Sequence, residues 1–149
     1  MNIIITVLVI IILLPTFLGL YRTRQTQDSS NQKIFLSGKV PNPKPAGFYK
    51  GSVSFKTTWQ GKKFDASSSS GINLISGKEQ YPFKTYIGIG IQDRSLDVYK
   101  IDYNIPQNPF WLRFILDEIV ETSPGKYLGK VHINLFGFPF SLGYFQLKK

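Results

Sequence analysis

The sequence predicts a mainly β fold, in which an N-terminal transmembrane helix precedes an antiparallel β-barrel with one short helical insertion. Three observations lead to this prediction. The first twenty residues contain a long apolar run without charge. Several later segments alternate apolar and polar side chains, the period of half-buried strands. Aromatic residues make up 15% of the chain, which suits strands and apolar cavities better than helical bundles.

Length and composition limit the possible architectures and chemistries. The chain has 149 residues and a net charge of +9. Without the anchor and a short stalk, about 115 residues remain, enough for one domain with its own core. The absence of cysteine excludes disulfides, thiolate nucleophiles and cysteine metal sites.

The N-terminal segment, residues 1–21, is predicted to be an uncleaved membrane anchor. The uncharged run Ile3 to Leu20 would span roughly 27 Å as a helix, close to the ~30 Å hydrocarbon layer. A cleaved signal peptide is the alternative, but it would favour a basic residue before the run and small residues at the cleavage site. Gly19 fits such a site, whereas Phe17 does not. Two arginines, at positions 22 and 24, follow the run, so we expect the domain on the cytoplasmic side.

Residues 22–45 are predicted to be a polar stalk and a proline-rich linker. The stretch 25–32 is polar and aperiodic, which indicates a flexible connection. Pro41, Pro43 and Pro45 alternate in the next stretch, which favours extended chain that cannot join a sheet interior.

Residues 46–149 carry the strand signals. The clearest alternation runs from Tyr49 to Trp59, followed by a turn at residues 60–63. Further strands are predicted at 71–75, 83–91, 96–104, in a hairpin over 118–135, and at 140–147. Asn108 and Pro109 mark the start of a short helical insertion. Closure into a barrel is the simplest arrangement, because it removes exposed sheet edges.

Three stretches resemble small lipocalin-like bacterial proteins of the calycin type. Residues 47–51, GFYKG, are similar to their GxWxG signature, with Tyr49 in the tryptophan place. Residues 59–64, WQGKKF, resemble their W-x-G-K-x-F run, and the stretch from Asp117 to Gly129 is also similar. The resemblance implies a lipocalin-like barrel, and it implies no catalytic residues. In lipocalins the signature tryptophan closes the barrel floor, and tyrosine can take the same role.

The inner face of such a barrel is the first candidate site, as a cavity for a lipid or another apolar small molecule. The predicted ligand-binding residues are Tyr49, Phe55, Trp59, Phe83, Tyr99, Tyr103 and Arg113. The alternative is a filled core, because bulky aromatics both fill and line barrels. Lys62 and Lys63 beside aromatics, or Arg113 beside Trp111, would hold an anionic headgroup; a snorkelling surface role is the common alternative.

The basic surface is the second candidate. Seven lysines and no acid lie between Ser29 and Phe64. Lysines near an anionic leaflet attract it by about 1 kcal/mol each, so contact with anionic lipid is expected through Lys39, Lys44 and Lys50. An ordinary solvated face is the alternative. Nucleic-acid binding is not expected, because RNP, helix-turn-helix and zinc-finger signatures are absent from the sequence.

Enzyme chemistry is not expected. His132 is the single histidine, and its strand pattern predicts an exposed position. The sequence has no GxSxG nucleophile elbow and no carboxylate-rich cluster for a metal, so neither a metal nor a cofactor is expected. The leading hypothesis is a single-pass membrane protein whose barrel binds an apolar molecule near the bilayer. A membrane-tethered interaction or accessory domain with a filled core is the alternative.

Overall fold

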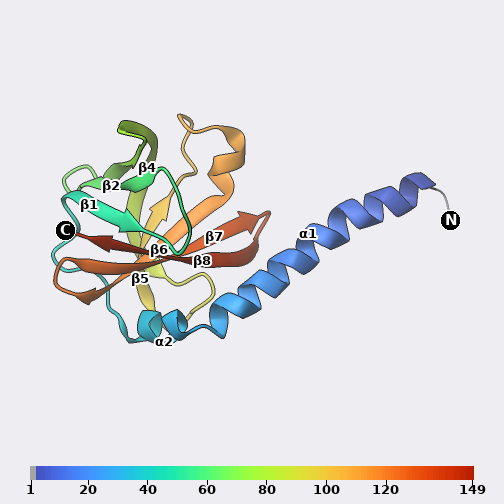
Figure 1. The fold of residues 1–149 in the computed structure, drawn as a ribbon, viewed down its shortest axis with the longest axis horizontal. Helices are drawn as coiled ribbons and strands as arrows, with labels where there is room; N and C mark the ends of the chain where they lie inside the picture. The colour runs from blue at the N-terminus through green and yellow to red at the C-terminus, as the bar shows by residue number, and fades with distance from the viewer. Residues whose placement is uncertain (1–2) are drawn as a thin grey trace.

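The computed structural model describes residues 3–149. A long N-terminal helix is followed by a closed antiparallel barrel (Figure 1). Within that range eight strands pair in sequence order, and β1 also pairs with β8 to close the barrel. The strands are β1 Gly47–Ser52, β2 Trp59–Asp65, β3 Ser70–Ile75, β4 Lys78–Ile89, β5 Asp97–Asp102, β6 Ile115–Ser123, β7 Lys126–Leu135 and β8 Phe138–Lys148. The predicted mainly β fold with a closed barrel is confirmed.

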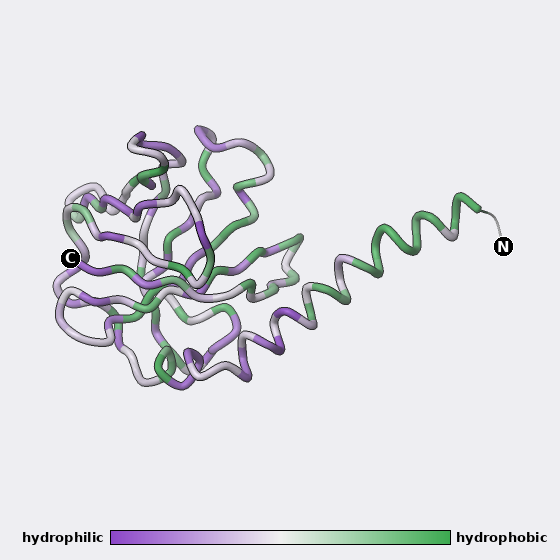
Figure 2. The backbone as a smooth tube through the Cα atoms, viewed as in Figure 1, coloured by the Kyte–Doolittle hydropathy of each residue, from purple (hydrophilic) through white to green (hydrophobic). Residues whose placement is uncertain are grey.

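The long helix α1, Ile3–Gln27, projects from the barrel, and its outer part is uniformly apolar (Figure 2). Its most apolar window has a mean hydropathy of 3.0 and no buried residue, so the helix is long and apolar enough to cross a membrane. A signal sequence near the N-terminus would have the same features. Met1 and Asn2, where the predicted anchor begins, lie outside the described residues.

The segment predicted as a flexible stalk is mostly helical. Residues 25–27 complete α1, and α2, Ser30–Ser37, follows after a short break. The prediction failed because the stretch gains its order from contacts with the barrel. Thr26, Gln32 and Phe35 are all buried there.

The predicted continuous strand from Tyr49 to Trp59 is also wrong. β1 ends at Ser52, residues 53–58 form a loop, and the predicted turn at 60–63 lies inside β2. The alternation in this stretch has another cause, since Val53, Phe55 and Thr57 all line a cavity from the loop.

Inward-facing aromatic and aliphatic side chains fill most of the barrel. The buried core consists of Tyr49, Phe64, Phe83, Tyr99, Ile101, Tyr103, Leu112, Ile119, Tyr127, Phe145 and Leu147. Ring pairs at 5.1–5.7 Å connect Tyr49 with Tyr127 and with Phe64 at the end where β1 begins. Tyr49 therefore packs against aromatic side chains in the barrel interior. Ile87 and Ile89, which share a face with Phe83 in the predicted strand, are instead exposed.

A short 3-10 helix, η1 Phe110–Phe114, stands where the helical insertion was predicted. Asn108 does not cap it. Its side-chain amide instead donates to the backbone oxygens of Pro82 and Tyr103, at 2.7 and 2.9 Å, and so fixes the loop on the barrel.

The outer face of β5–β8 is covered, which overturns the predicted exposure of His132. That ring is completely buried, with Nδ1 3.1 Å from the Ser141 hydroxyl and Nε2 3.2 Å from Glu118 Oε2. α1 packs on β8, and α2 packs on β6 and β7. Under these helices the polar residues Glu118, Lys130, His132 and Ser141 are buried. The strand period correctly places His132 outside the barrel, but it carries no information about the helices above.

Candidate ligand-binding site

A cavity of about 260 Å³ opens at the end of the barrel formed by the 53–58 loop and η1. Its walls are mainly apolar and aromatic, with one polar group of side chains among them. The lining residues are Val53, Phe55, Thr57, Trp59, Lys62, Asn73, Ile75, Tyr81, Tyr103, Leu112, Ile115, Asp117, Val131 and Phe145. Apolar walls with a few polar groups that converge are the usual composition of a small-molecule site.

An irregularity in β2 turns Lys62 into the barrel. Trp59 and Phe64 both face inward, which strict alternation does not allow, and the register shifts between Trp59 and Gly61. Gly61 has φ of +140°, and a Cβ there would clash with the Tyr49 carbonyl oxygen. Only glycine fits this position, so the bulge and the inward direction of Lys62 depend on it.

Inside the barrel, Lys62 is held by three polar side chains. Its ammonium lies 3.0 Å from Asp117 Oδ2 and donates to Asn73 Oδ1 at 3.0 Å and to the Tyr103 hydroxyl. The side chains of Lys62 and Asp117 are 3% and 5% exposed, so the ion pair is almost dry. Asn73 also donates to Tyr103 Oη at 3.1 Å, which connects the four side chains into one network.

Four aromatic rings surround the same ammonium. Lys62 Nζ lies 5.1–5.5 Å from the ring centroids of Trp59, Phe83, Tyr103 and Phe145. At these distances the ring faces attract a cation, and the attraction is stronger in a desolvated site. The aromatic rings and Asp117 together compensate part of the cost of burying the charge.

The protonation states of the network follow from burial. Desolvation lowers the pKa of Lys62, and the charge and hydrogen bond of Asp117 act in the opposite direction. Burial raises the pKa of Tyr103 well above its ordinary value, and the neighbouring Asp117 carboxylate raises it further. Tyr103 therefore stays a neutral phenol at physiological pH.

One acceptor in the network is free. Asp117 Oδ1 is buried and has no hydrogen-bond partner within residues 3–149, while Oδ2 pairs with Lys62. Leaving a buried polar atom unpaired costs about 1–3 kcal/mol. A hydroxyl or amine hydrogen delivered through the cavity would satisfy this oxygen.

The structure places the predicted ligand-binding residues at different depths. Phe55, Trp59 and Tyr103 line the cavity. Phe83 lies behind Lys62. The remaining three predicted residues, Tyr49, Tyr99 and Arg113, do not line the cavity.

Tyr49 and Tyr99 are in the filled part of the core, where Tyr49 Oη is 3.3 Å from Tyr127 Oη and Tyr99 donates to Thr85 Oγ1 at 2.8 Å. Arg113 lies outside the cavity lining and donates to the backbone oxygens of Asn108 and Pro106. Its role in the structure is to hold the loop before β6.

Sequence reasoning missed Asn73 and Asp117, and it gave Lys62 only the role of holding an anionic headgroup over an apolar pocket, with a surface position as the alternative. The available signal was Gly61 directly before Lys62 in a strand between aromatics, since an isolated glycine in a strand indicates a bulge. The partner Asp117 had no local signal, because it comes from a strand distant in sequence.

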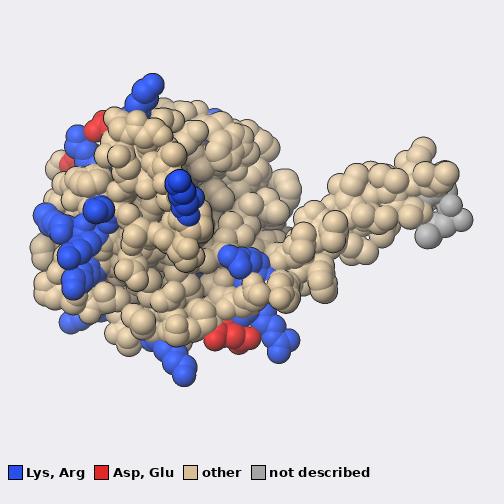
Figure 3. Space-filling model, in the orientation of Figure 1, with Lys and Arg blue, Asp and Glu red and all other residues tan. Residues whose placement is uncertain are grey.

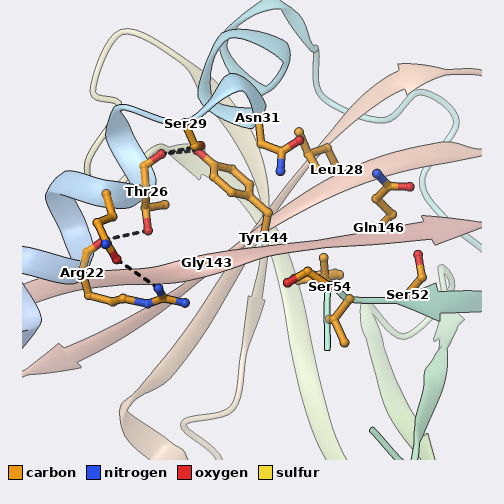
Figure 4. A pocket seen from close by; sticks show the side chains of 13 residues that line it. Arg22, Thr26, Ser29, Asn31, Ser52, Ser54, Leu128, Gly143, Tyr144 and Gln146 are labelled. Carbon is orange, nitrogen blue, oxygen red and sulfur yellow. Dashed lines mark hydrogen bonds between the residues drawn. The ribbon is translucent and has the colours of Figure 1, made fainter. Parts of the chain in front are cut away.

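A second hollow, of about 390 Å³, lies between α1, β1 and β8 (Figure 4). It is polar, and Arg22, Thr26, Asn31, Tyr144 and Gln146 are among its lining residues. Arg22 Nε donates to the Leu142 carbonyl at 3.1 Å, and its Nη1 donates to Gln25 Oε1. The hydrogen bonds here stabilise the contact between α1 and the barrel.

A buried polar cluster joins α2 to the outer barrel face. Lys130 is fully buried and lies 2.8 Å from both Asp93 Oδ2 and Gln32 Oε1. Beside it, Glu118 pairs with Lys100 at 3.0 Å. Burial alone raises the pKa of Glu118, but the nearby His132 and Lys100 outweigh this and hold that pKa below its ordinary value. The cluster faces away from the cavity and serves to dock the helix.

Comparison with known proteins gives no family assignment. No protein-family model matches the chain, and neither a curated protein nor a solved structure shows significant similarity to it.

Proposed function

We propose that this chain is a single-pass membrane protein whose lipocalin-like barrel binds an apolar molecule that carries one hydrogen-bond donor. The observation that supports this most strongly is the cavity itself. Its aromatic walls suit a hydrocarbon chain or ring, and the unpaired Asp117 Oδ1 suits a hydroxyl or amine at the inner end. Long-chain alcohols, monoacylglycerols and isoprenoid alcohols have this chemistry.

The volume limits the size of the ligand. At about 260 Å³ the cavity is slightly smaller than the ~300–1,000 Å³ typical of drug-sized sites. One chain or one small ring fits, with any remaining part of the ligand outside the mouth.

Membrane anchoring is part of the proposal. α1 is one continuous helix, and its Gly19 packs against the Phe140 ring of β8. Thr23 Oγ1 accepts the Ser141 N–H at 2.9 Å. Cleavage of a signal peptide after Gly19 would remove part of this packing, which favours a retained anchor. Arg22 and Arg24 support a cytoplasmic location for the barrel.

We infer a binding role and no catalysis. The ammonium of Lys62 has three polar partners and four ring faces around it, so this amine is not free to act as a nucleophile in the cavity. Contact of Lys39, Lys44 and Lys50 with anionic lipid remains a separate proposal.

Native mass spectrometry of the full chain, released from nanodiscs that contain total cellular lipid, tests ligand binding. Wild-type protein should retain a small apolar adduct. Val131→Trp, which fills the cavity, should reduce the adduct at least about tenfold, since its ring occupies the ligand volume.

Leu74→Trp is the matched control, because Leu74 is on β3 but does not line the cavity. It should keep the adduct. If wild-type protein carries no adduct, or if both variants retain it equally, the proposal is wrong and a filled interaction domain becomes the better description.

A further inference from the structure

Large aromatic side chains are exposed around the mouth of the cavity. We define the aromatic rim as Phe55, Phe110, Trp111, Phe136 and Phe138, which are 61–86% exposed. They come from three segments, the 53–58 loop, η1 and the β7–β8 hairpin. Contiguous exposed apolar side chains of this size indicate an interaction surface.

Ring contacts connect the rim to the cavity. Phe55 is itself a lining residue, and Trp111 packs on the lining residue Tyr81 with ring centroids 6.1 Å apart. Phe136 packs on Phe114 of η1 at 5.8 Å. The rim and the mouth are therefore one surface.

The contacts between α1 and β8 show which part of α1 lies level with the rim along the helix axis. Tyr144 Oη donates to the Thr26 carbonyl, and Arg22 donates to the Leu142 carbonyl. Further back along β8, the Phe140 ring packs on Gly19, where a Cβ would lie 2.6 Å from it.

From Tyr144 back to Phe140, toward the start of β8, the contacts on α1 shift from Thr26 to Gly19. The start of β8 therefore lies nearer the N-terminus of α1. Phe138 and Phe136 precede Phe140 in the chain and so lie further in this direction. Each strand residue adds about 3.3 Å to the distance. The hairpin tip is then level with the apolar part of α1, before Gly19. Figure 1 shows the β7–β8 hairpin pointing the way that α1 leaves the barrel.

The charges near the rim agree with this placement. Residues 133–143 carry no charged side chain, and the other two rim segments, 53–58 and 104–114, contain one lysine and one arginine but no acid. Phenylalanine and tryptophan with occasional basic residues are typical of the bilayer interface.

We propose that the aromatic rim is inserted into the interface of the bilayer that α1 crosses, so that the cavity opens directly to the lipid. This inference rests on the membrane anchoring in the proposed function. The ligand then enters laterally from the leaflet and does not pass through water.

The same orientation separates two poles of the domain. Lys50 pairs with Lys148 across β1 and β8, and Lys149 Nζ donates to the Ala46 carbonyl, so these lysines gather at the C-terminal end. Figure 3 shows Lys and Arg side chains clustered at this end, away from the apolar part of α1. Lysines there would face away from the anchoring bilayer, so this orientation and the separately proposed contact of Lys50 with anionic lipid of the same bilayer exclude each other.

Site-directed fluorescence in nanodiscs tests the inference. The chain has no cysteine, so single-cysteine variants can be labelled cleanly with an environment-sensitive dye. The test positions are Phe136→Cys and Trp111→Cys on the rim, both of them exposed. Leu13→Cys reports the anchor, and Lys148→Cys reports the opposite pole. The probe is a phosphatidylcholine nanodisc with or without doxyl-labelled lipid.

Rim labels should be quenched by doxyl lipid about twofold or more above the Lys148 label, with blue-shifted emission. If Leu13 is quenched while both rim labels behave like Lys148, the rim is in water and the inference is overturned. If Leu13 is not quenched, anchoring fails and the inference fails with it. Neither result depends on the adduct measured by mass spectrometry, so failure of ligand binding is recognised separately.

Discussion

At the scale of single residues, the unusual feature is an ion pair inside a small barrel. Lys62 and Asp117 are almost completely buried, and Asn73 and Tyr103 form hydrogen bonds with them, while Asp117 Oδ1 has no partner within residues 3–149. Desolvating two charges costs several kcal/mol each, so such a pair is a poor source of stability. Its presence at the inner end of a cavity is better explained by recognition of a polar group.

Removal of one partner tests the energetics of this pair. Asp117→Leu should lower the free energy of unfolding by about 3–5 kcal/mol, because it leaves the Lys62 ammonium buried and unpaired. The double variant Lys62→Met with Asp117→Leu should recover most of this loss. Urea unfolding of the full chain in mild detergent, followed by tryptophan fluorescence, measures both. Equal destabilisation by the single and double variants would contradict the account.

At the scale of elements, sequence patterns identified the strands better than the connections. The period-two alternation placed Tyr99, Ile101 and Tyr103 correctly on one inner face. It failed between Val53 and Thr58, where a loop has the same alternation because its residues line a cavity. The helical order of residues 25–37 could not be predicted either, since it depends on barrel contacts made by Gln32 and Phe35.

The residues of the candidate site also fall into those that the sequence pattern predicts and those that it does not. Phe55, Trp59 and Tyr103 could be proposed from the sequence because aromatic residues on an inner face follow from the period. Lys62 and Asp117 could not be paired, because a β-bulge at Gly61 turns one inward and the other is brought by a distant strand. A polar pair inside a barrel leaves no periodic signal.

The docking of α1 on β8 gives a prediction at this scale. Gly19→Leu should separate the helix from the strand, since even a Cβ would lie 2.6 Å from the Phe140 ring. Overpacking of this kind costs about 1–3 kcal/mol. The Ser141 amide, which donates to Thr23, should then exchange with deuterium several-fold faster.

Leu18→Phe changes an exposed position of the same helix and is the control. It should leave exchange at Ser141 unchanged. Unaltered protection of Ser141 in Gly19→Leu would show that α1 is not held by this contact.

At the scale of the whole molecule, the apolar helix α1, the aromatic rim and the cavity lie on connected parts of the structure. α1 reaches the barrel beside β8 (Figure 1). The β7–β8 hairpin carries the rim aromatics Phe136 and Phe138, and the rim residue Phe55 also lines the cavity. Lysines lie at the other pole (Figure 3). This arrangement suits a protein that takes an apolar molecule from the leaflet and shields it within a barrel.

The central claim is that an apolar ligand with a donor group occupies the cavity. Photolabelling with a diazirine-bearing long-chain alcohol, applied to the full chain in nanodiscs, tests it most directly. Crosslinks are expected on cavity-lining residues of the segments 57–62 and 112–117, which contain no rim residue, and these crosslinks should be lost in Val131→Trp. Crosslinks confined to α1 and the aromatic rim, with the same pattern in wild type and Val131→Trp, would contradict it.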